Sequence, residues 1–131
     1  MGKETLGKML IQYKNNLPLV SMVIVDAGSN KRITVDAHLD FASSKTIMPT
    51  YIANELNLSF AGSDETVTGA GIIHVPYYEV VIEVFGRVHE NVHVGCLDFP
   101  ERTPARALLG RDILDSYRIC LDGKKKVIEV S

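Results

Sequence analysis

The sequence predicts a mostly β domain, a small closed barrel with one or two short helices. Three observations favour this class. Hydrophobic residues alternate with a period of two along most of the chain, which is typical of strands with one buried face. Clusters of glycine, asparagine, aspartate and proline separate these runs. A helical period appears in only two short segments, one after residue 48 and one after residue 110.

The first two predicted strands form a hairpin that runs into Asp40. Leu19–Val25 is an apolar run, and the turn cluster Asp26–Asn30 follows it directly. Ile33–Leu39 then returns as the second strand. The small residues Ala42-Ser43-Ser44 come just after Asp40, so the carboxylate lies where a strand gives way to a turn.

The period changes over Pro49–Leu58, which we expect to be helical. Ile52, Ala53 and Leu56 share one helical face. Pro49 suits the first helical position, because its missing N–H is not needed there, and Asn57 can end the helix.

The rest of the chain alternates between strands and turns. Ser59–Asp64 is polar and is predicted as a connecting stretch. The predicted elements that follow are two short arms joined by a glycine-rich tip (Thr66–Val75), a hairpin turning at Gly86-Arg87 (Tyr77–Phe85 and Val88–Val94), a surface loop (Leu97–Arg106), a strand (Ala107–Leu109), a helix (Arg111–Tyr117) and a final hairpin (Arg118–Leu121 and Val127–Val130).

Composition indicates one soluble globular domain. The chain has 131 residues, of which 46% are hydrophobic and 23% charged, which suffices for a buried core. We assign residues 17–131 to this domain and treat residues 1–16 as an N-terminal segment: an extra strand, a dimer arm or a partly ordered tail. A formal charge of −2 gives no basic face for nucleic acid or an anionic membrane. No secretory or membrane-spanning run is present, so we expect a cytoplasmic protein.

The two cysteines, Cys96 and Cys120, both lie inside apolar strands and far apart in sequence. We predict two buried free thiols. A disulfide between them is the alternative.

Asp40 is the leading candidate for a catalytic residue. About seventy residues later the chain repeats the outline of its surroundings, with Ala107-Leu108-Leu109-Gly110-Arg111 giving another strand, small residue and helix. Two such corners facing each other can form a cleft with an acid at its floor. The alternative is that Asp40 simply caps a turn. Asp26, which precedes Ala27-Gly28, is a weaker candidate because its neighbours are typical of a hairpin turn.

From about Val20 to Val130, these features in this order resemble the retropepsin-like aspartic proteases. The Leu108-Leu109-Gly110-Arg111-Asp112 element is fairly specific in this context, and the glycine-tipped flap alone is a weak match. The resemblance implies an acid-protease-like barrel with one lobe per chain, acting as a homodimer without metal or cofactor. It implies cleavage of a peptide or protein by a water activated between two Asp40 side chains. It also implies site roles for an active-site turn (Phe41, Ala42, Ser43), a flap that binds substrate (Gly69, Ala70, Gly71, Ile72) and a second turn (Leu109, Gly110, Arg111).

The active-site turn departs from the pattern of that family. The usual run is Asp-Thr-Gly or Asp-Ser-Gly, whereas this chain has Asp40-Phe41-Ala42. In the family the hydroxyl at the second position bonds across the dimer, and Phe41 has no hydroxyl. A dimeric peptide-binding or scaffolding module with weakened catalysis is therefore the second hypothesis.

A third hypothesis is a zinc hydrolase, because His89-Glu90-Asn91-Val92-His93 fits the pattern His-Glu-x-x-His. That pattern needs a helix to bring both imidazoles to one face. The glycines at positions 86 and 95 and the β-branched valines favour a strand instead. We therefore expect two histidines on the exposed side of a strand and no metal.

Overall fold

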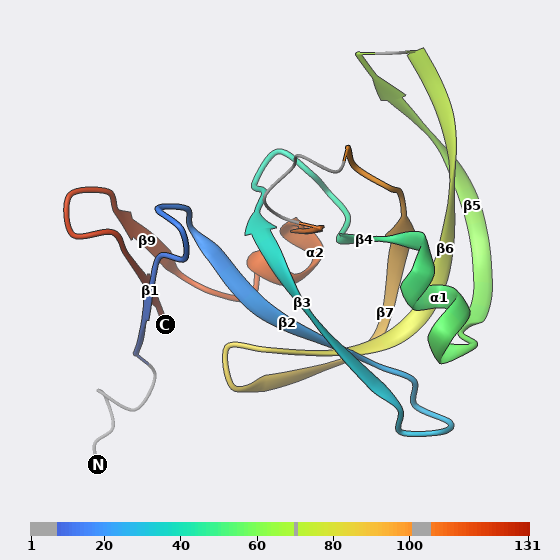
Figure 1. The fold of residues 1–131 in the computed structure, drawn as a ribbon, viewed down its shortest axis with the longest axis horizontal. Helices are drawn as coiled ribbons and strands as arrows, with labels where there is room; N and C mark the ends of the chain where they lie inside the picture. The colour runs from blue at the N-terminus through green and yellow to red at the C-terminus, as the bar shows by residue number, and fades with distance from the viewer. Residues whose placement is uncertain (1–7, 70, 101–105) are drawn as a thin grey trace.

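The computed structural model describes residues 8–69, 71–100 and 106–131. Its strands and helices, shown in Figure 1, are β1 (Met9–Gln12), β2 (Leu19–Val25), β3 (Arg32–Leu39), β4 (Ile47–Met48), α1 (Thr50–Leu56), β5 (Ser59–Thr68), β6 (Gly71–Val84), β7 (Arg87–Cys96), β8 (Ala107–Leu109), α2 (Arg111–Leu114), β9 (Ile119–Asp122) and β10 (Val127–Val130). In the described residues, no helix has the length and apolarity needed to cross a bilayer.

The main sheet closes on itself into a barrel, as predicted. Its strand order is β2-β3-β8-β4-β7-β6-β5. β2 also pairs with β6, which closes a ring of the strands from β2 to β6 and leaves β5 paired to β6 outside the ring. The closing pair places Ile24 opposite Ile82, and both side chains are completely buried. Side chains that point inward from the ring, including Met22 and Leu109, fill the barrel with apolar groups. Burial of this surface supplies the main force for closure.

Strand β8 lies between two strands that are consecutive in the chain. It runs parallel to β3, with Leu109 opposite Leu39, and antiparallel to β4, with Leu108 opposite Ile47. The residues that follow β3 and β8 therefore emerge at the same end of the barrel. This arrangement brings Asp40 and Gly110 together although the sequence separates them by about seventy positions.

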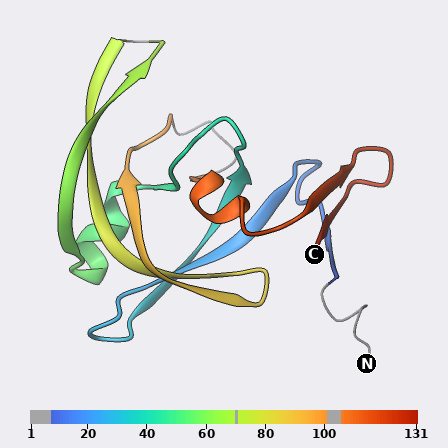
Figure 2. The same ribbon diagram turned by 180° about the vertical axis from the view of Figure 1, so that it is seen from behind.

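The hairpin of β5 and β6 extends beyond the barrel, as Figures 1 and 2 show. β6 pairs with β7 from Tyr77 to Val84, whereas residues 71–76 of β6 pair with residues 63–68 of β5. We call these two six-residue stretches the flap arm. Ser59–Asp64, predicted as a connection, instead belongs to β5. The prediction was wrong because this stretch lies at the edge of the sheet with both faces exposed or partly buried, so no alternation of apolar and polar residues marks it.

The two helices are close to the predicted positions but shorter. Pro49 has extended backbone angles, φ −67° and ψ 150°, so it precedes α1 instead of opening it. Asn57 ends α1 in the left-handed conformation with φ 52°, as predicted. α2 stops at Leu114 instead of Tyr117, because the next amides bond three residues back: Ser116 N–H donates to the carbonyl of Ile113.

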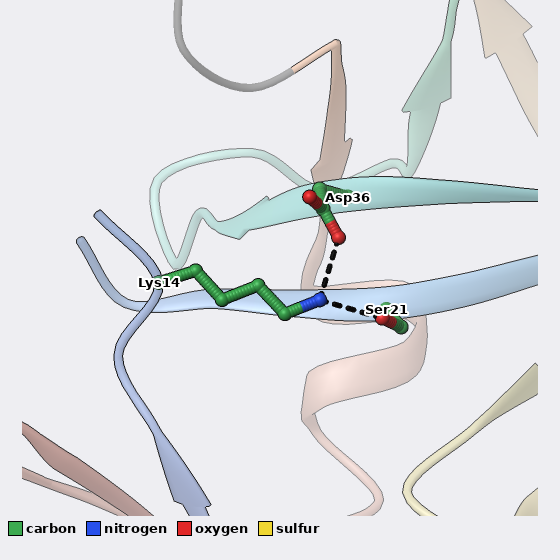
Figure 3. A network of polar contacts seen from close by, with 3 residues as sticks. All are labelled: Lys14, Ser21 and Asp36. Carbon is green, nitrogen blue, oxygen red and sulfur yellow. Dashed lines mark hydrogen bonds and ion pairs between the residues drawn. The ribbon is translucent and has the colours of Figure 1, made fainter. Parts of the chain in front are cut away.

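A second, three-stranded sheet with the order β1-β10-β9 joins the two ends of the described chain. β1 pairs antiparallel with the chain's own β10, so part of the N-terminal segment forms a strand in cis. Beyond β1, Lys14 Nζ donates to Ser21 Oγ at 2.7 Å and to Asp36 Oδ1 at 2.8 Å (Figure 3). These bonds attach the segment to the β2–β3 hairpin.

The cysteines do not match the prediction fully. Both are free, but Cys96 is buried in β7 whereas Cys120 is exposed on β9. The prediction of two buried thiols was wrong for Cys120, because β9 belongs to the small sheet and turns this residue to its outer face. Residues 101–105 of the predicted surface loop lie outside the described residues.

Candidate active site

Asp40 lies directly after β3, where the strand ends at the mouth of the barrel. Its main-chain N–H donates to the carbonyl of Leu109 at 3.0 Å, which extends the β3–β8 pairing by one residue. The side chain is half-buried. Its Oδ1 accepts a hydrogen bond from the Ala42 N–H at 3.0 Å, and this bond orients the carboxylate over its own turn.

Residues 40–43 form the active-site turn. Ser43 N–H donates to the Asp40 carbonyl at 3.2 Å and closes the turn, and Ser43 Oγ donates to the Lys45 carbonyl at 2.7 Å. Phe41 and Ala42 are exposed, and Phe41 presents 46% of its surface. A large apolar side chain at this exposure is available for contact with another molecule.

The second turn, Leu109 to Arg111, packs directly on the first. Arg111 N–H donates to the Ser43 carbonyl at 2.8 Å, and Arg111 Nη1 donates to the Phe41 carbonyl at 2.7 Å. Gly110 is required by close approach: a Cβ there would lie 2.5 Å from the carbonyl carbon of Lys45. The structure thus brings the predicted residues of both turns into one cluster.

Two further residues hold the turns together. Thr46 is completely buried; its Oγ1 donates to Asp112 Oδ1 at 2.7 Å and accepts from Gly110 N–H at 3.1 Å. The second carboxylate oxygen, Asp112 Oδ2, accepts the Thr46 N–H at 3.1 Å. Sequence analysis did not name Thr46. It included Asp112 as the last residue of the element that carries the resemblance, but it gave the Asp112 carboxylate no partner.

The predicted flap residues lie at the far end of the flap arm. Gly71 has φ 111°, which L side chains rarely adopt, so glycine is needed at this turn. Val67 and Ile72 face each other across the arm and expose 81% and 65% of their surfaces. Gly69 occupies the turn, and Ala70 lies outside the described residues.

The His-Glu-x-x-His segment lies in β7, so the expectation of a strand is confirmed. His89 is half-buried, not exposed as predicted, because its Nε2 lies 2.6 Å from Tyr117 Oη and its ring packs on that tyrosine. His93 Nε2 lies 3.8 Å from Glu79 Oε1 instead. Within the described part of the chain, no three His, Cys, Asp or Glu side chains are grouped to hold a metal ion.

Asp26 lies in the β2–β3 hairpin turn, far along the strands from Asp40. Its Oδ2 accepts hydrogen bonds from Ser29 Oγ at 2.6 Å and Ser29 N–H at 3.1 Å. The bond from the Ser29 hydroxyl lowers the pKa of Asp26 below its ordinary value, as the main-chain bond does to a smaller extent. These are the contacts of a turn-stabilising aspartate.

Comparison with solved structures shows which fold this is. A retropepsin-like aspartic protease from Rickettsia conorii aligns at 17% identity over 95% of this chain and 89% of its own, with a TM-score of 0.60. The EIAV protease complexed with the inhibitor HBY-793 aligns at 19% identity over 81% and 93%, with a TM-score of 0.58. The Simian Foamy Virus (mac) protease aligns at 18% identity over 74% and 91%, with a TM-score of 0.52.

The chain therefore has the retropepsin-like fold, a mostly β barrel with two short helices. At these identities the likeness establishes the fold. No protein-family description matches the sequence, and no curated protein matches it either.

Proposed function

We propose that this protein is an aspartic endopeptidase that acts as a homodimer, with Asp40 of each protomer providing one carboxyl group. The observation that carries the proposal is the position of Asp40. It ends a barrel strand of the retropepsin-like fold, and the Ala42 amide holds its carboxylate beside the second turn. One solved protein with this fold is described as a retropepsin-like aspartic protease, and another as a protease in complex with an inhibitor.

Hydrolysis by this site needs two carboxyl groups. Two carboxylates about 3 Å apart cannot both be ionised, so the pair shares one proton. The ionised member then acts as a base on a water molecule between them, and the protonated member donates to the carbonyl oxygen of the scissile bond. The pair functions as one coupled unit. One Asp40 from each of two protomers supplies it without a covalent intermediate.

The flap arm supplies the binding surface for substrate in this proposal. An extended peptide would lie between the arm and the active-site turns and form main-chain hydrogen bonds as an added strand. The exposed pair Val67 and Ile72 would then be covered by apolar side chains of the peptide. The glycines at positions 69 and 71 permit the tight turn from which the arm closes.

Dimerisation is expected to use the outer face of the β1-β10-β9 sheet. A groove of ≈ 490 Å³ lies on this face between Leu10, Cys120, Leu121 and Val127. Leu10 exposes 66% of its surface there. Charged residues of both signs, such as Lys125 and Glu129, border the groove, so a twofold copy can match it in charge as well as in shape.

A second candidate is a dimeric peptide-binding module with little or no hydrolysis. The turn sequence favours it, because Phe41 has no hydroxyl to bond across the dimer and Ala42 adds a methyl group beside the carboxylate. The exposed ring of Phe41 would pack on its symmetry-related copy in either case.

The two candidates are separated by a cleavage assay. The purified protein is incubated with a library of extended peptides between pH 4 and 7.5, and the fragments are identified by mass spectrometry. We expect cleavage by the wild type and none by Asp40→Asn. Asp115→Asn is the matched control, because Asp115 belongs to neither turn and its side chain is exposed at the end of α2.

Each outcome assigns one candidate. Cleavage that Asp40→Asn removes and Asp115→Asn retains supports the protease. Peptide binding that both variants retain, with no fragments at any pH, supports the binding module. Cleavage that survives in Asp40→Asn rejects the role of this aspartate.

A further inference from the structure

We infer that Arg111 is a positioning residue for Asp40, acting through the peptide unit that joins Phe41 to Ala42. The inference rests on the proposed function and deepens it by naming what orients the carboxylate. Arg111 acts on the Asp40 carboxylate indirectly. It binds the main chain of the turn that presents Asp40.

The two hydrogen bonds at this peptide unit come from opposite sides. Arg111 Nη1 donates to the Phe41 carbonyl oxygen at 2.7 Å. The Ala42 N–H donates to Asp40 Oδ1 at 3.0 Å. The carbonyl of Phe41 and the N–H of Ala42 belong to the same planar group, so neither can rotate without the other. The guanidinium therefore fixes the direction in which the N–H points at the carboxylate.

The cation also strengthens the second bond. A charged donor on the carbonyl oxygen polarises the amide and makes its N–H a better donor, as in other hydrogen-bonded chains. Arginine stays protonated at every pH at which proteins fold, so this effect does not vary over the working range. The order of contacts is guanidinium, carbonyl, amide and carboxylate.

Arg111 is itself well placed to transmit this constraint. Its main-chain N–H donates to the Ser43 carbonyl at 2.8 Å, so one residue binds the turn on both sides of Ala42. Its neighbour Gly110 is packed against Lys45 and bonded to buried Thr46, which fixes the main chain from which the Arg111 side chain extends.

This brace explains how the turn holds its shape without a hydroxyl at position 41. The side chain of Phe41 offers no hydrogen-bonding group, but its main-chain carbonyl does. Arg111 uses that carbonyl from within the same chain. The orientation of Asp40 is then set inside each protomer before two protomers meet.

The test is a measurement on the amide of Ala42 in the intact protein. Because this N–H bonds to Asp40, its NMR chemical shift should change as the Asp40 carboxyl is titrated. Asp40→Asn gives the background without a titrating group. In Arg111→Ala we expect the pH-dependent change in the Ala42 amide shift to fall to less than half of its wild-type size. In Arg111→Lys, which keeps a charged donor, we expect most of the wild-type change.

Arg118→Ala is the matched control, since Arg118 is an exposed arginine a few residues beyond α2. In this variant the chemical shift of the Ala42 amide should change with pH as it does in the wild type. If Arg111→Ala does not fold, Arg111→Lys and Arg111→Gln give the comparison between a charged and a neutral donor. An Ala42 amide that titrates equally in the wild type and in the Arg111 variants overturns the inference.

The amide measurement needs no turnover, so it is independent of whether the protein cleaves peptides. A wild type that cleaves nothing rejects the proposed function and leaves the amide result standing. Where peptides are cleaved, kcat of Arg111→Ala should fall by about 10- to 100-fold with KM nearly unchanged, because a misdirected carboxylate affects the reacting geometry more than binding. An unchanged kcat overturns the positioning role.

Discussion

Thr46 and Asp112 form a closed pair of hydrogen bonds between the two turns of the candidate site. The Thr46 hydroxyl donates to Oδ1 at 2.7 Å and the Thr46 amide donates to Oδ2 at 3.1 Å, so both carboxylate oxygens are used. The same hydroxyl accepts the N–H of Gly110. Thr46 is completely buried and its polar side-chain atom has partners, whereas Asp112 is exposed, so the pair links the residue before β4 to the start of α2.

Replacing Thr46 by valine should destabilise the protein by about 1–3 kcal/mol. Valine keeps the shape but leaves the Gly110 N–H and one oxygen of Asp112 without their partner. Urea unfolding measures the change. Thr34→Val is the matched control, because Thr34 lies exposed in β3 and its change should be small. Equal effects of the two substitutions would contradict the role of the buried pair.

Gly110→Ala should cost about 3 kcal/mol of stability. A Cβ at this position would lie 2.5 Å from the carbonyl carbon and oxygen of Lys45 and 2.9 Å from the amide nitrogen of Thr46, and main-chain atoms cannot move aside easily. Gly123→Ala is the control, since nothing lies within 4 Å of its Cβ. Thermal unfolding of both variants measures the loss of stability. A Gly110→Ala protein as stable as Gly123→Ala would show that the two turns can move apart.

His89 should make the protein less stable as the pH falls below 6.5. Burial lowers the pKa of His89 from its ordinary value of 6.5, Arg87 lowers it further, and Asp112 opposes the change. The unfolded chain therefore binds a proton at a higher pH than the folded one, and acid favours unfolding. His89→Gln should lose less stability than the wild type between pH 7.5 and 5.5, measured by urea unfolding at each pH.

His93→Gln serves as the comparison for that measurement, because His93 lies exposed in the same strand. The stability of His93→Gln should fall with pH by as much as that of the wild type. A pH dependence that is unchanged in His89→Gln would assign the acid sensitivity to other groups.

The two thiols should react very differently with a thiol-specific reagent at pH 8. Burial raises the pKa of Cys96 to about 11, with a smaller contribution from Asp98, so its thiolate is scarce at this pH. Cys120 is exposed on β9. We expect rapid labelling of Cys120 and slow labelling of Cys96. Mass spectrometry of the intact protein over time measures both rates. Rapid labelling that persists in Cys120→Ser would contradict the buried position of Cys96.

Leu10→Lys should weaken self-association by about tenfold or more, because it places a charge in the groove of the β1-β10-β9 sheet. Within one chain the new lysine would face Glu129, its cross-strand neighbour, so the fold itself should tolerate it. Analytical ultracentrifugation over a range of concentrations measures the effect. Val88→Lys is the control, because Val88 is also exposed and apolar but lies on β7. Equal association of both variants would place the dimer contact elsewhere.

Much of the fold could be predicted from the period of the sequence. β3 and β10 each bury alternate side chains, and their sequences show the matching alternation. The strand before Gly110 was predicted instead as a short apolar run that ends at a glycine. The start of β5, before the flap arm, carries no such signal. Its side chains are exposed or only partly buried on both faces, so it was interpreted as a connection.

The candidate site was predictable only in part. Asp40 and Gly110 were found because two strand ends share one outline of apolar, small and helical residues. The link between Thr46 and Asp112 joins positions 66 residues apart, and no local pattern relates a threonine to a distant aspartate. The contact of Arg111 with the Phe41 carbonyl could not be predicted from the sequence either. Any residue at position 41 supplies a main-chain carbonyl, so the contact leaves no pattern.

A single fourteen-residue strand, β6, forms both a wall of the barrel and one side of the flap arm. One side of the flap arm and the barrel strand that carries it are thus one continuous strand. A flap grafted from another protein of this fold would have to preserve the pairing of Tyr77 with Gly95, where the barrel wall ends and the flap arm begins. Altered selectivity is then best sought at the tip, where side chains can change without shifting the frame that carries them.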